Sequence, residues 1–275
     1  MADSADILIH NPWQKLRNFT DARIGLGRAG VSLPTQAHLE FQLAHARARD
    51  AVHLPLDFDQ LQNDIERVFD GEIVRLKSRA SSRAEYLQRP DYGRELSDVS
   101  TAFLKSLPSV SKSIVVVIAD GLSSLAVQRH AVPLLASLQS ALASTRLTID
   151  RVCLVEQGRV AVGDPIGELM QAQMLVMLIG ERPGLSSPDS LGVYYTFEPK
   201  SGKHDALRNC ISNVRKEGLS YEEATHKLMY LLLESDRRRL SGVELKDESD
   251  NGGSQLETHS NGNLLLRANV PSSNK

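Results

Sequence analysis

One stretch of the chain places an acidic residue directly after a continuous apolar run. The residues "MLVMLIGERPGLSSPDSLGVYYTF" (174–197) predict a buried strand, a loop that opens with Glu181, and a second strand. A carboxylate at the end of a buried strand can act as a catalytic base, hold a ligand, or be an ordinary residue of a solvated turn. Pro183 and Gly184 predict that the chain turns sharply just after it.

The other residue types that perform chemistry do not form a known motif in this sequence. The eight histidines are scattered, and none stands at metal-ligand spacing from a cysteine. The segment "DGLSS" lacks the G-x-S-x-G pattern of a nucleophile elbow, so Ser123 is expected to cap a helix. Cys210 has no histidine partner in its segment, and a small packed thiol near a binding surface is its expected role. The sequence therefore predicts no catalytic and no metal-ligating residue, and Glu181 lacks the partner that a base needs.

A glycine-rich segment, "GLGRAG" (25–30), matches the G-x-G-x-x-G pattern of dinucleotide-binding loops. That motif needs a strand before it and a helix that opens on it. Here "NFTDARI" is not a convincing buried strand, and "VSLP" follows in place of a helix. The favoured interpretation is a loop in which the backbone passes close to another part of the molecule. Arg28 within it remains able to contact an anionic ligand or a partner.

The elements that must position these residues change in character near residue 108. Before that point the patterns predict helices over about 35–50, 57–69 and 91–107, and no clear strand. After it, "SIVVVIAD", "RLTIDRVCLVEQG" and "MLVMLIG" predict three strands. Helical segments separate them, and Asp164 is the expected N-cap of the second. This alternation predicts a parallel sheet with right-handed crossovers.

Ligands of such sheets bind beyond the carboxyl ends of the strands, where Asp120-Gly121 and Gly180-Glu181 stand. The predicted class is α/β, a three-layer parallel sheet with flanking helices, preceded by a helical N-terminal region. We divide the chain into an N-terminal arm (1–22), a helical region packed on the core (23–110), an α/β core (111–246) and a disordered tail (247–275).

Composition excludes several classes of protein. The chain has 32 Lys and Arg against 34 Asp and Glu, so it lacks the basic surplus of a dedicated nucleic-acid binder. Its apolar runs are about seven residues long, whereas a membrane span needs roughly 20. The N-terminus has no basic region before an apolar core, unlike a secretory signal. Two cysteines are too few for a disulfide framework, which fits a reducing cytoplasm.

Six stretches together resemble the small (light) subunit of ethanolamine ammonia-lyase, over about residues 11–246. They are "DARIGLGRAGVSLPT" (21–35), "YLQRPDYGRELS" (86–97), "VVIADGLSSLAV" (116–127), "VEQGRVAVGDPIGE" (155–168), "LIGERPGLSSPDSLGVYYTF" (178–197) and "RNCISNVRKEGLSYEEA" (208–224). Long stretches in the same order are far more specific than any one short motif.

The resemblance implies a subunit of an adenosylcobalamin-dependent enzyme that converts ethanolamine to acetaldehyde and ammonia by radical chemistry. A large subunit with a (β/α)₈ barrel would carry the substrate site, and the two chains would assemble into a hetero-oligomer. Residues 111–246 would then form a cobalamin-cradling core. The family's cofactor is similar to a base-on corrinoid, which agrees with the lack of a cobalt-ligating D-x-H-x-x-G motif here.

Three positions match the cofactor contacts of that family: Val160 in "GRVAVGD", Glu181 in "GERPGL" and Cys210 in "NCISN". Backbone N–H and C=O groups at Val160 and Cys210 would form hydrogen bonds with the amide groups of the corrin rim, and Glu181 would accept hydrogen bonds from those amides. Two alternatives stay open: a flavodoxin-like nucleotide- or flavin-binding enzyme, and an adaptor subunit without a ligand. Some family members carry an N-terminal extension similar to a microcompartment-targeting segment. The short stretch here leaves little room for one, so the resemblance implies a cytoplasmic protein, inside a bacterial microcompartment or outside it.

Overall fold

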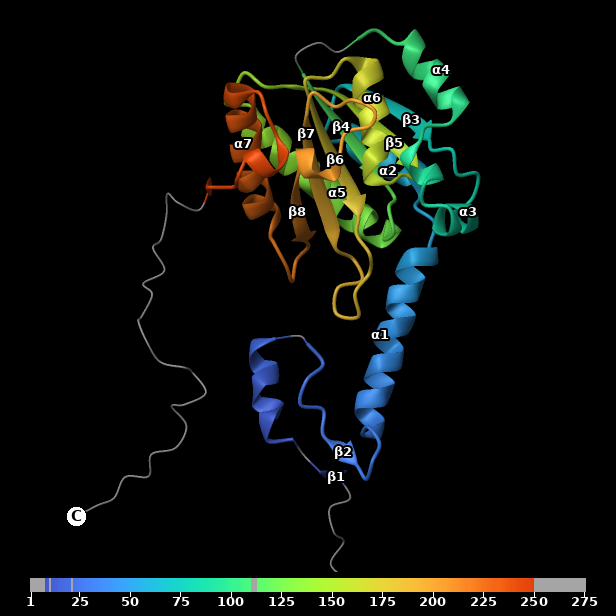
Figure 1. Cartoon of the computed structure of the whole chain (residues 1–275), viewed down its shortest axis with the longest axis vertical. Coiled ribbons are helices and arrows are strands. Elements are labelled where there is room, and N and C mark those ends of the chain that lie inside the picture. Colours follow the sequence, from blue (N-terminus) through green and yellow to red (C-terminus); the bar gives the residue numbers. More distant parts are fainter. Residues whose placement is uncertain (1–7, 10, 21, 110–112, 250–275) are drawn as a thin grey trace, which may run out of the picture.

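The computed structural model describes residues 8–9, 11–20, 22–109 and 113–249 of the chain. At its centre is a six-stranded sheet in the order β3-β5-β4-β6-β7-β8 (Figure 1). In that order the strands span Glu72–Lys77, Ile149–Glu156, Ile114–Ala119, Met174–Gly180, Leu191–Phe197 and Arg208–Val214. β3, β5, β4 and β6 are parallel, and β7 and β8 continue the sheet in antiparallel fashion. The predicted α/β class is confirmed, with two antiparallel strands added to the expected parallel ones.

The prediction that no strand precedes residue 108 is wrong, because β3 belongs to the central sheet. Three of its six residues are charged, and only Val74 and Leu76 are buried in it. An edge strand pairs on one side only and carries charged residues that discourage further pairing. Its sequence therefore lacks the continuous apolar run that marks β4, in which all six residues are buried.

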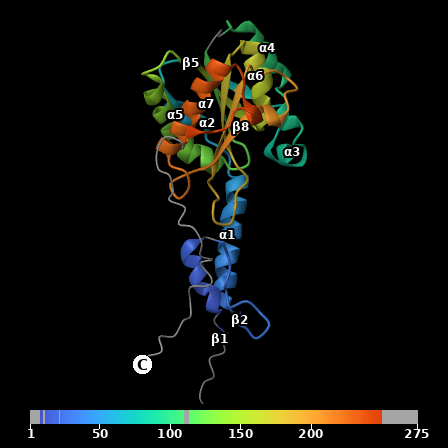
Figure 2. The same ribbon diagram turned by 60° about the vertical axis from the view of Figure 1, so that its left-hand side comes forward.

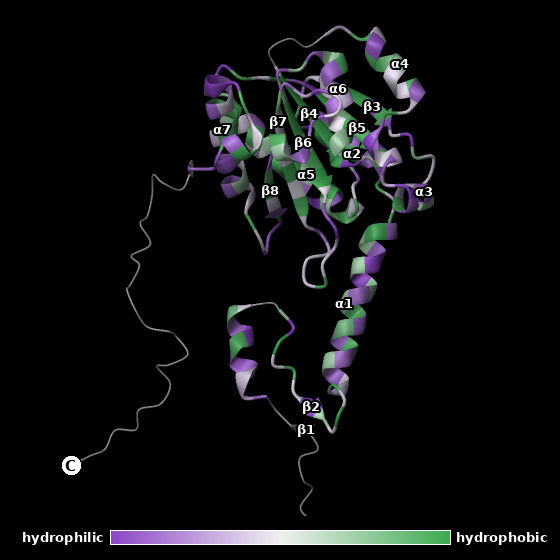
Figure 3. Cartoon of the chain, viewed as in Figure 1, coloured by the Kyte–Doolittle hydropathy of each residue, from purple (hydrophilic) through white to green (hydrophobic). Residues whose placement is uncertain are grey.

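Helices cover both faces of the sheet and produce the expected three layers (Figures 1 and 2). Alternate residues of β4 point to opposite faces, as the period of a strand requires. Ile114, Val116 and Ile118 pack with α2 (Phe58–Glu66), α5 (Ser124–Leu142) and α7 (Tyr221–Arg238). The residues between them pack with α4 (Asp98–Ser106) and α6 (Gly163–Met170). In Figure 3 the strands are accordingly the most hydrophobic part of the core.

Short elements connect the layers. The helix expected over 91–107 is a 3-10 turn, η2 (Tyr92–Arg94), followed by α4, since Ser97 caps the helix by accepting a hydrogen bond from the N–H of Ser100. The remaining short elements are α3 (Arg83–Gln88), η3 (Val160–Val162), η4 (Asp205–Leu207) and η5 (Gly242–Glu244). Ser123 caps α5 as predicted, because its side chain accepts from the N–H of Ala126.

The N-terminal part forms an arm that projects from the core (Figures 1 and 2). α1 (Thr35–His53) is its long helix, and only Ala37 and Ala51 are buried along it. The rest of the arm consists of η1 (Pro12–Phe19) and a two-stranded ribbon of β1 (Leu8–Ile9) and β2 (Arg28–Ala29). The helix expected over 35–50 is thus confirmed, but it extends away from the sheet.

No helix in the described part of the chain is long and apolar enough to cross a membrane. Apart from residues 247–249, the tail predicted after Lys246 lies outside the described residues.

Candidate functional site

The carboxyl ends of β4 and β6 meet where the chain reverses its direction across the sheet. β4 leads through α5 to β5 on one side, and β5 leads through α6 to β6 on the other. Between strands that diverge in this way an α/β sheet has its usual ligand crevice. The two loops that the sequence analysis placed at strand ends, 120–121 and 180–181, flank this point.

Two glycines let these loops cross each other closely. The N–H of Leu122 donates to the carbonyl of Gly180 over 2.9 Å. A Cβ at Gly180 would lie 2.0 Å from the carbonyl oxygen of Ser123, so no larger residue fits there. Gly121 has φ +59°, and a Cβ on it would lie 2.3 Å from the Gly180 oxygen. The crossing fixes where Glu181 leaves the sheet.

A cavity of about 400 Å³ opens beside this crossing, on the face that α6 covers. Its wall draws on distant parts of the chain: one residue lies on α3, others follow β4, β5 and β6, and two lie on β7 and β8. The side chains that line it include those of Tyr86, Arg159, Val160, Glu181, Arg182, Tyr194 and Ser212. Two of the three residues predicted to contact a cofactor, Val160 and Glu181, therefore share one cavity.

Glu181 spans three strands with its side chain. Its Cγ and Oε1 lie over Gly192 of β7, where a Cβ would come within 3.0 Å of them. Its carboxylate accepts hydrogen bonds from the hydroxyl of Ser212 at 2.5 Å, the N–H of Asn213 at 3.2 Å, and the hydroxyl of Ser190. The carboxylate thus ties β6 to β8 across β7. No general acid or base contacts it in the described ranges, so the solvated-turn and catalytic-base interpretations both lose support.

Cys210 lies on β8 directly opposite Tyr194 of β7, which lines the cavity. Ser212, two residues further along β8, points to the same side and also lines it. Although Cys210 is exposed, surrounding protein atoms raise the pKa of its thiol, and the Tyr194 hydroxyl opposes this only in part. Cys210 is therefore a neutral thiol beside the cavity, exposed and not packed as the sequence analysis expects, and its contact with a cofactor stays a prediction.

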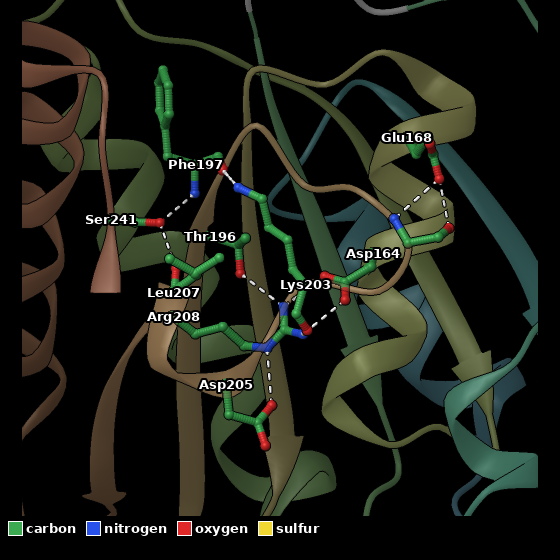
Figure 4. A network of polar contacts seen from close by, with 10 residues as sticks. Asp164, Glu168, Thr196, Phe197, Lys203, Asp205, Leu207, Arg208 and Ser241 are labelled. Atoms are coloured by element: carbon green, nitrogen blue, oxygen red, sulfur yellow. Dashed lines mark hydrogen bonds and ion pairs between the residues drawn. The ribbon is translucent and has the colours of Figure 1, made fainter. Parts of the chain in front are cut away.

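A buried ion pair between Asp164 and Arg208 joins the segment after β5 to the start of β8 (Figure 4). The guanidinium of Arg208, at the start of β8, donates to both carboxylate oxygens of Asp164 over 2.6 and 2.7 Å. Both side chains are 3% exposed. Asp164 follows Val160 by four residues and Arg208 precedes Cys210 by two, so the pair couples the two segments.

Asp164 is not the N-cap that the sequence predicts. α6 begins at Gly163, with Val162 at the cap position, and Asp164 lies inside the first turn. The carboxylate turns away from the backbone N–H groups because a buried guanidinium is a stronger partner than an N–H group. Only the tertiary structure brings Arg208 close enough to compete.

Behind the glycine crossing, Arg83 connects the arm to the core. It donates to the carbonyl oxygens of Val52 in the last turn of α1 at 2.8 Å, of Gly121 at 2.8 Å and of Leu122 at 3.1 Å. It also lies 3.5 Å from Asp120. Burial raises the pKa of Asp120 to about 6, although Arg83 and nearby backbone N–H groups oppose the shift.

Several residues of the cavity wall are missing from the sequence prediction. Arg159 follows the carboxyl end of β5, so the rule that placed Glu181 at a strand end also points to it. Arg182 and Ser212 stand next to predicted residues or two positions away from them. Tyr194 and Tyr86 carry no local signal, because only the pairing of β7 with β8 and the packing of α3 bring them to the site.

The glycine-rich segment lies in the arm and does not line this cavity. Gly25 has φ +60°, and a Cβ on it would lie 3.0 Å from the backbone of Gln14. Arg28 and Ala29 form β2 and pair with β1, so no helix opens on the segment. The interpretation as a close backbone contact is confirmed. Among the described residues, no three His, Cys, Asp or Glu side chains cluster in a way that could hold a metal ion.

Comparison with known proteins identifies the family of the chain. Residues 10–246 match the model of the family "Ethanolamine ammonia-lyase light chain (EutC)". An ethanolamine ammonia-lyase small subunit of Azotobacter vinelandii is 56% identical over 260 residues, which cover 93% of this chain and 96% of the relative. One of Pseudomonas fluorescens is 56% identical over 245 residues, covering 87% and 88%. One of Xanthomonas campestris is 56% identical over 241 residues, covering 86% and 88%. The chain therefore belongs to the family of ethanolamine ammonia-lyase light chains, the small subunits of a carbon–nitrogen lyase.

Proposed function

We propose that this chain supplies one wall of an adenosylcobalamin site in an ethanolamine ammonia-lyase, whose larger subunit supplies the substrate site. The observation that supports this most directly is the cavity at the divergence of the strands. Val160 and Glu181 line it and Cys210 lies at its margin, although the three are far apart in sequence. The cavity is open, as a surface completed by a second chain must be.

The residues of the cavity suit a corrinoid. A corrin macrocycle carries amide groups around its rim, which both donate and accept hydrogen bonds. An ionised carboxylate has about four acceptor positions, and Ser190, Ser212 and Asn213 already donate to that of Glu181. One position remains for a rim amide. A cavity of about 400 Å³ is smaller than a whole corrinoid, so it would hold one side of the cofactor.

When bound, adenosylcobalamin would supply the radical that starts the reaction. The task of this chain is to bind and orient the cofactor against the larger subunit. Val160 and Cys210 present compact side chains, which let a broad ligand approach the backbone. Burial raises the pKa of Tyr194, with Cys210 adding to the shift, so its hydroxyl stays a neutral hydrogen-bonding group beside them.

The arm supports the proposal that a large partner covers this chain. Eight large apolar side chains between residues 13 and 43 are 38% to 105% exposed. Monomeric proteins rarely expose contiguous apolar patches of more than a few hundred Å², and stable complexes bury roughly 800 Å² per partner. The most exposed of the eight are Trp13, Phe19, Val31, Leu33, Leu39 and Leu43.

The arm and the cavity lie toward the same edge of the sheet. Arg83 joins the last turn of α1 to the crossing loops beside the cavity. A second hollow, of about 370 Å³, has walls from both the arm, through Arg23, and the loop after Glu181, through Leu185. One partner can therefore cover the arm and close the cofactor cavity together. The proposal places the assembly in the cytoplasm, inside a bacterial microcompartment or outside it.

Co-expression with a candidate larger subunit tests the proposed function. The purified complex should release ammonia from ethanolamine only when adenosylcobalamin is added, and it should show a bound corrinoid spectrum. Glu181→Ala should weaken cobalamin binding by more than tenfold, as expected for a lost hydrogen bond to a charged group. Glu66→Ala, an exposed glutamate on α2, is the control and should leave binding unchanged. A complex that binds a flavin, or that releases ammonia without a corrinoid, would contradict the proposal.

A further inference from the structure

Arg159 stands out in the cavity because part of its guanidinium has no partner. Its Nε is fully buried and makes no hydrogen bond, and its side chain lines the cavity. A buried donor without an acceptor is costly, and in native proteins it usually indicates an unseen water, ion or ligand. No acidic side chain forms an ion pair with Arg159 in the part of the chain that the structure describes.

The surroundings of Arg159 hold its side chain firmly in this place. Its Cγ packs against Gly93, where a Cβ would come within 2.7 Å, and its N–H donates to the Gly93 carbonyl over 2.7 Å. The guanidinium lies over the fully buried ring of Tyr86, 4.3 Å from its centroid. The Tyr86 hydroxyl in turn donates to the carbonyl of Gly158 over 3.1 Å. The charge is thus fixed in position before any ligand arrives.

The charges around the cavity do not balance. Arg182 also lines it and, like Arg159, has no ion pair within the described ranges. The single carboxylate of the wall, Glu181, accepts from neighbouring serines and the backbone, not from either arginine. Arg83 lies over the other part of the Tyr86 ring, 4.8 Å from the centroid, but Asp120 compensates it. The lining of the cavity therefore carries two positive charges and only one negative charge.

We infer that Arg159, assisted by Arg182, binds a phosphodiester, and that this phosphodiester is the one in the nucleotide loop of a base-on corrinoid. The inference rests on the proposed function for the identity of the ligand. Guanidinium groups pair with phosphate oxygens through two parallel hydrogen bonds, and the terminal nitrogens of Arg159, whose side chain lines the cavity, can form such a pair. The rim amides of a corrin are neutral and cannot compensate the charge, whereas the phosphodiester of the nucleotide loop is anionic.

The main competing account is that Arg159 only supports the wall by stacking on Tyr86. Stacking of a guanidinium on an aromatic ring contributes stability by itself. This account predicts that loss of the charge affects every corrinoid equally. The phosphodiester account predicts an effect only on ligands that carry the phosphate. The two are therefore separable by the choice of ligand.

The experiment compares Arg159→Met with the wild type in the co-expressed complex of both subunits. Methionine keeps an unbranched stem against Gly93 and Tyr86 and removes the charge. Binding is measured by equilibrium dialysis for adenosylcobalamin, for adenosylcobinamide, which lacks the phosphate, ribose and base, and for adenosylcobinamide phosphate, which retains a phosphate. Arg239→Met is the matched control, since Arg239 stacks on Phe197 at 4.8 Å and does not line the cavity.

We expect Arg159→Met to weaken adenosylcobalamin and adenosylcobinamide phosphate by roughly tenfold to a hundredfold, as for a lost charge-assisted bond. Binding of adenosylcobinamide should change less than twofold, and Arg239→Met should change none of the three. Equal loss for all three ligands, or no loss for any, would overturn the inference. A wild-type complex that binds no corrinoid at all would instead refute the proposed function.

A second measurement needs no variant and covers the case in which Arg159→Met does not assemble. Dissolved ions screen the attraction between the arginines and a phosphate before the ligand binds, so higher ionic strength should weaken the binding of phosphate-bearing ligands to the wild type. Raising NaCl from about 0.1 to 0.5 M should lower the affinity for adenosylcobalamin severalfold more than that for adenosylcobinamide. Equal salt dependence for the two ligands would show that no positively charged side chain of the site binds the phosphate.

Discussion

The core and the arm both carry large apolar side chains, but they use them in opposite ways. All six residues of β4 are buried, whereas α1, with nineteen residues, buries only Ala37 and Ala51. Along α1 the apolar residues recur at 37, 39, 41 and 43, a period of two that spreads them around a helix. A helix with such a distribution cannot turn one apolar face to its own core. The core therefore buries its own apolar side chains, whereas the arm leaves its large ones exposed.

The same contrast extends to polar groups. In the core, charged side chains that are buried are paired, as with Arg208 and Asp164. In the arm, Arg23 lies over the exposed ring of Phe41 at 5.5 Å and donates to a backbone carbonyl. The cavity shares features of both regions. Its wall is closely packed, but its arginines Arg159 and Arg182 form no ion pair within the described residues. Substitutions in core and arm should therefore differ in what they change.

The largest loss of stability is expected from Arg208→Met. Removal of one member of a buried ion pair leaves the other charge uncompensated, which costs about 3–5 kcal/mol. Thermal unfolding of the co-purified complex measures the loss. The double variant with Asp164→Asn should recover part of it, since no charge then remains buried. If the single variant melts like the wild type, the pair does not hold α6 against β8.

Gly180→Ala should come next, with a loss of about 3 kcal/mol for forcing a methyl group into backbone atoms. Its matched control in the arm is Gly30→Ala. Gly30 also has an unfavourable φ of +60°, but nothing lies within 4 Å of its Cβ position. The control should cost about 1 kcal/mol or less. Equal losses for the two variants would mean that the crossing of the loops is not close-packed.

Asp120 should give a smaller effect that depends on pH. Its folded-state pKa of about 6 lies above the value of about 3.9 in an unfolded chain. Its contribution to stability is thus fully present below about pH 4 and is lost as the pH rises through 6, a change of about 2 kcal/mol. Asp120→Asn keeps an acceptor for the N–H of Gly158 and should flatten this dependence. Calorimetry of both proteins between pH 4 and 7 measures it, and parallel curves would contradict the assignment.

The arm should show the smallest effect on unfolding. Leu39→Ser combined with Leu43→Ser alters exposed side chains, so the free energy of unfolding of this chain should change by less than about 0.5 kcal/mol. Co-purification with the larger subunit should nevertheless fall at least tenfold. Leu233→Ser, which alters an exposed leucine on α7, is the control. Unimpaired assembly of the double variant would show that the partner binds elsewhere.

The central strands of the core and the helices between them could be predicted from the sequence. The continuous apolar runs of β4 and β6 predict buried strands, and their alternation with helices predicts the parallel sheet. The sequence pattern does not predict β3, because this edge strand has charged residues at positions where a central strand has valine. Glu181 could be placed at the site because it follows a strand, and the same rule applies to Arg159. The prediction that Asp164 is an N-cap is wrong, because its local sequence fits an N-cap as well as it fits a residue that pairs with a distant arginine.

The α/β class, the edge of the sheet that carries the candidate site and, through long stretches of similarity, the family could be predicted from the residues alone. These depend on local periodicity and on the order of segments, which are written along the chain. The residues that face one another are known only from the folded chain: Glu181 lies against β8, Arg208 against Asp164, and Arg159 against the ring of Tyr86. Such contacts join residues tens of positions apart, and packing chooses among many partners of similar local chemistry. The uncompensated charge in the cavity therefore became visible only once the chain was folded.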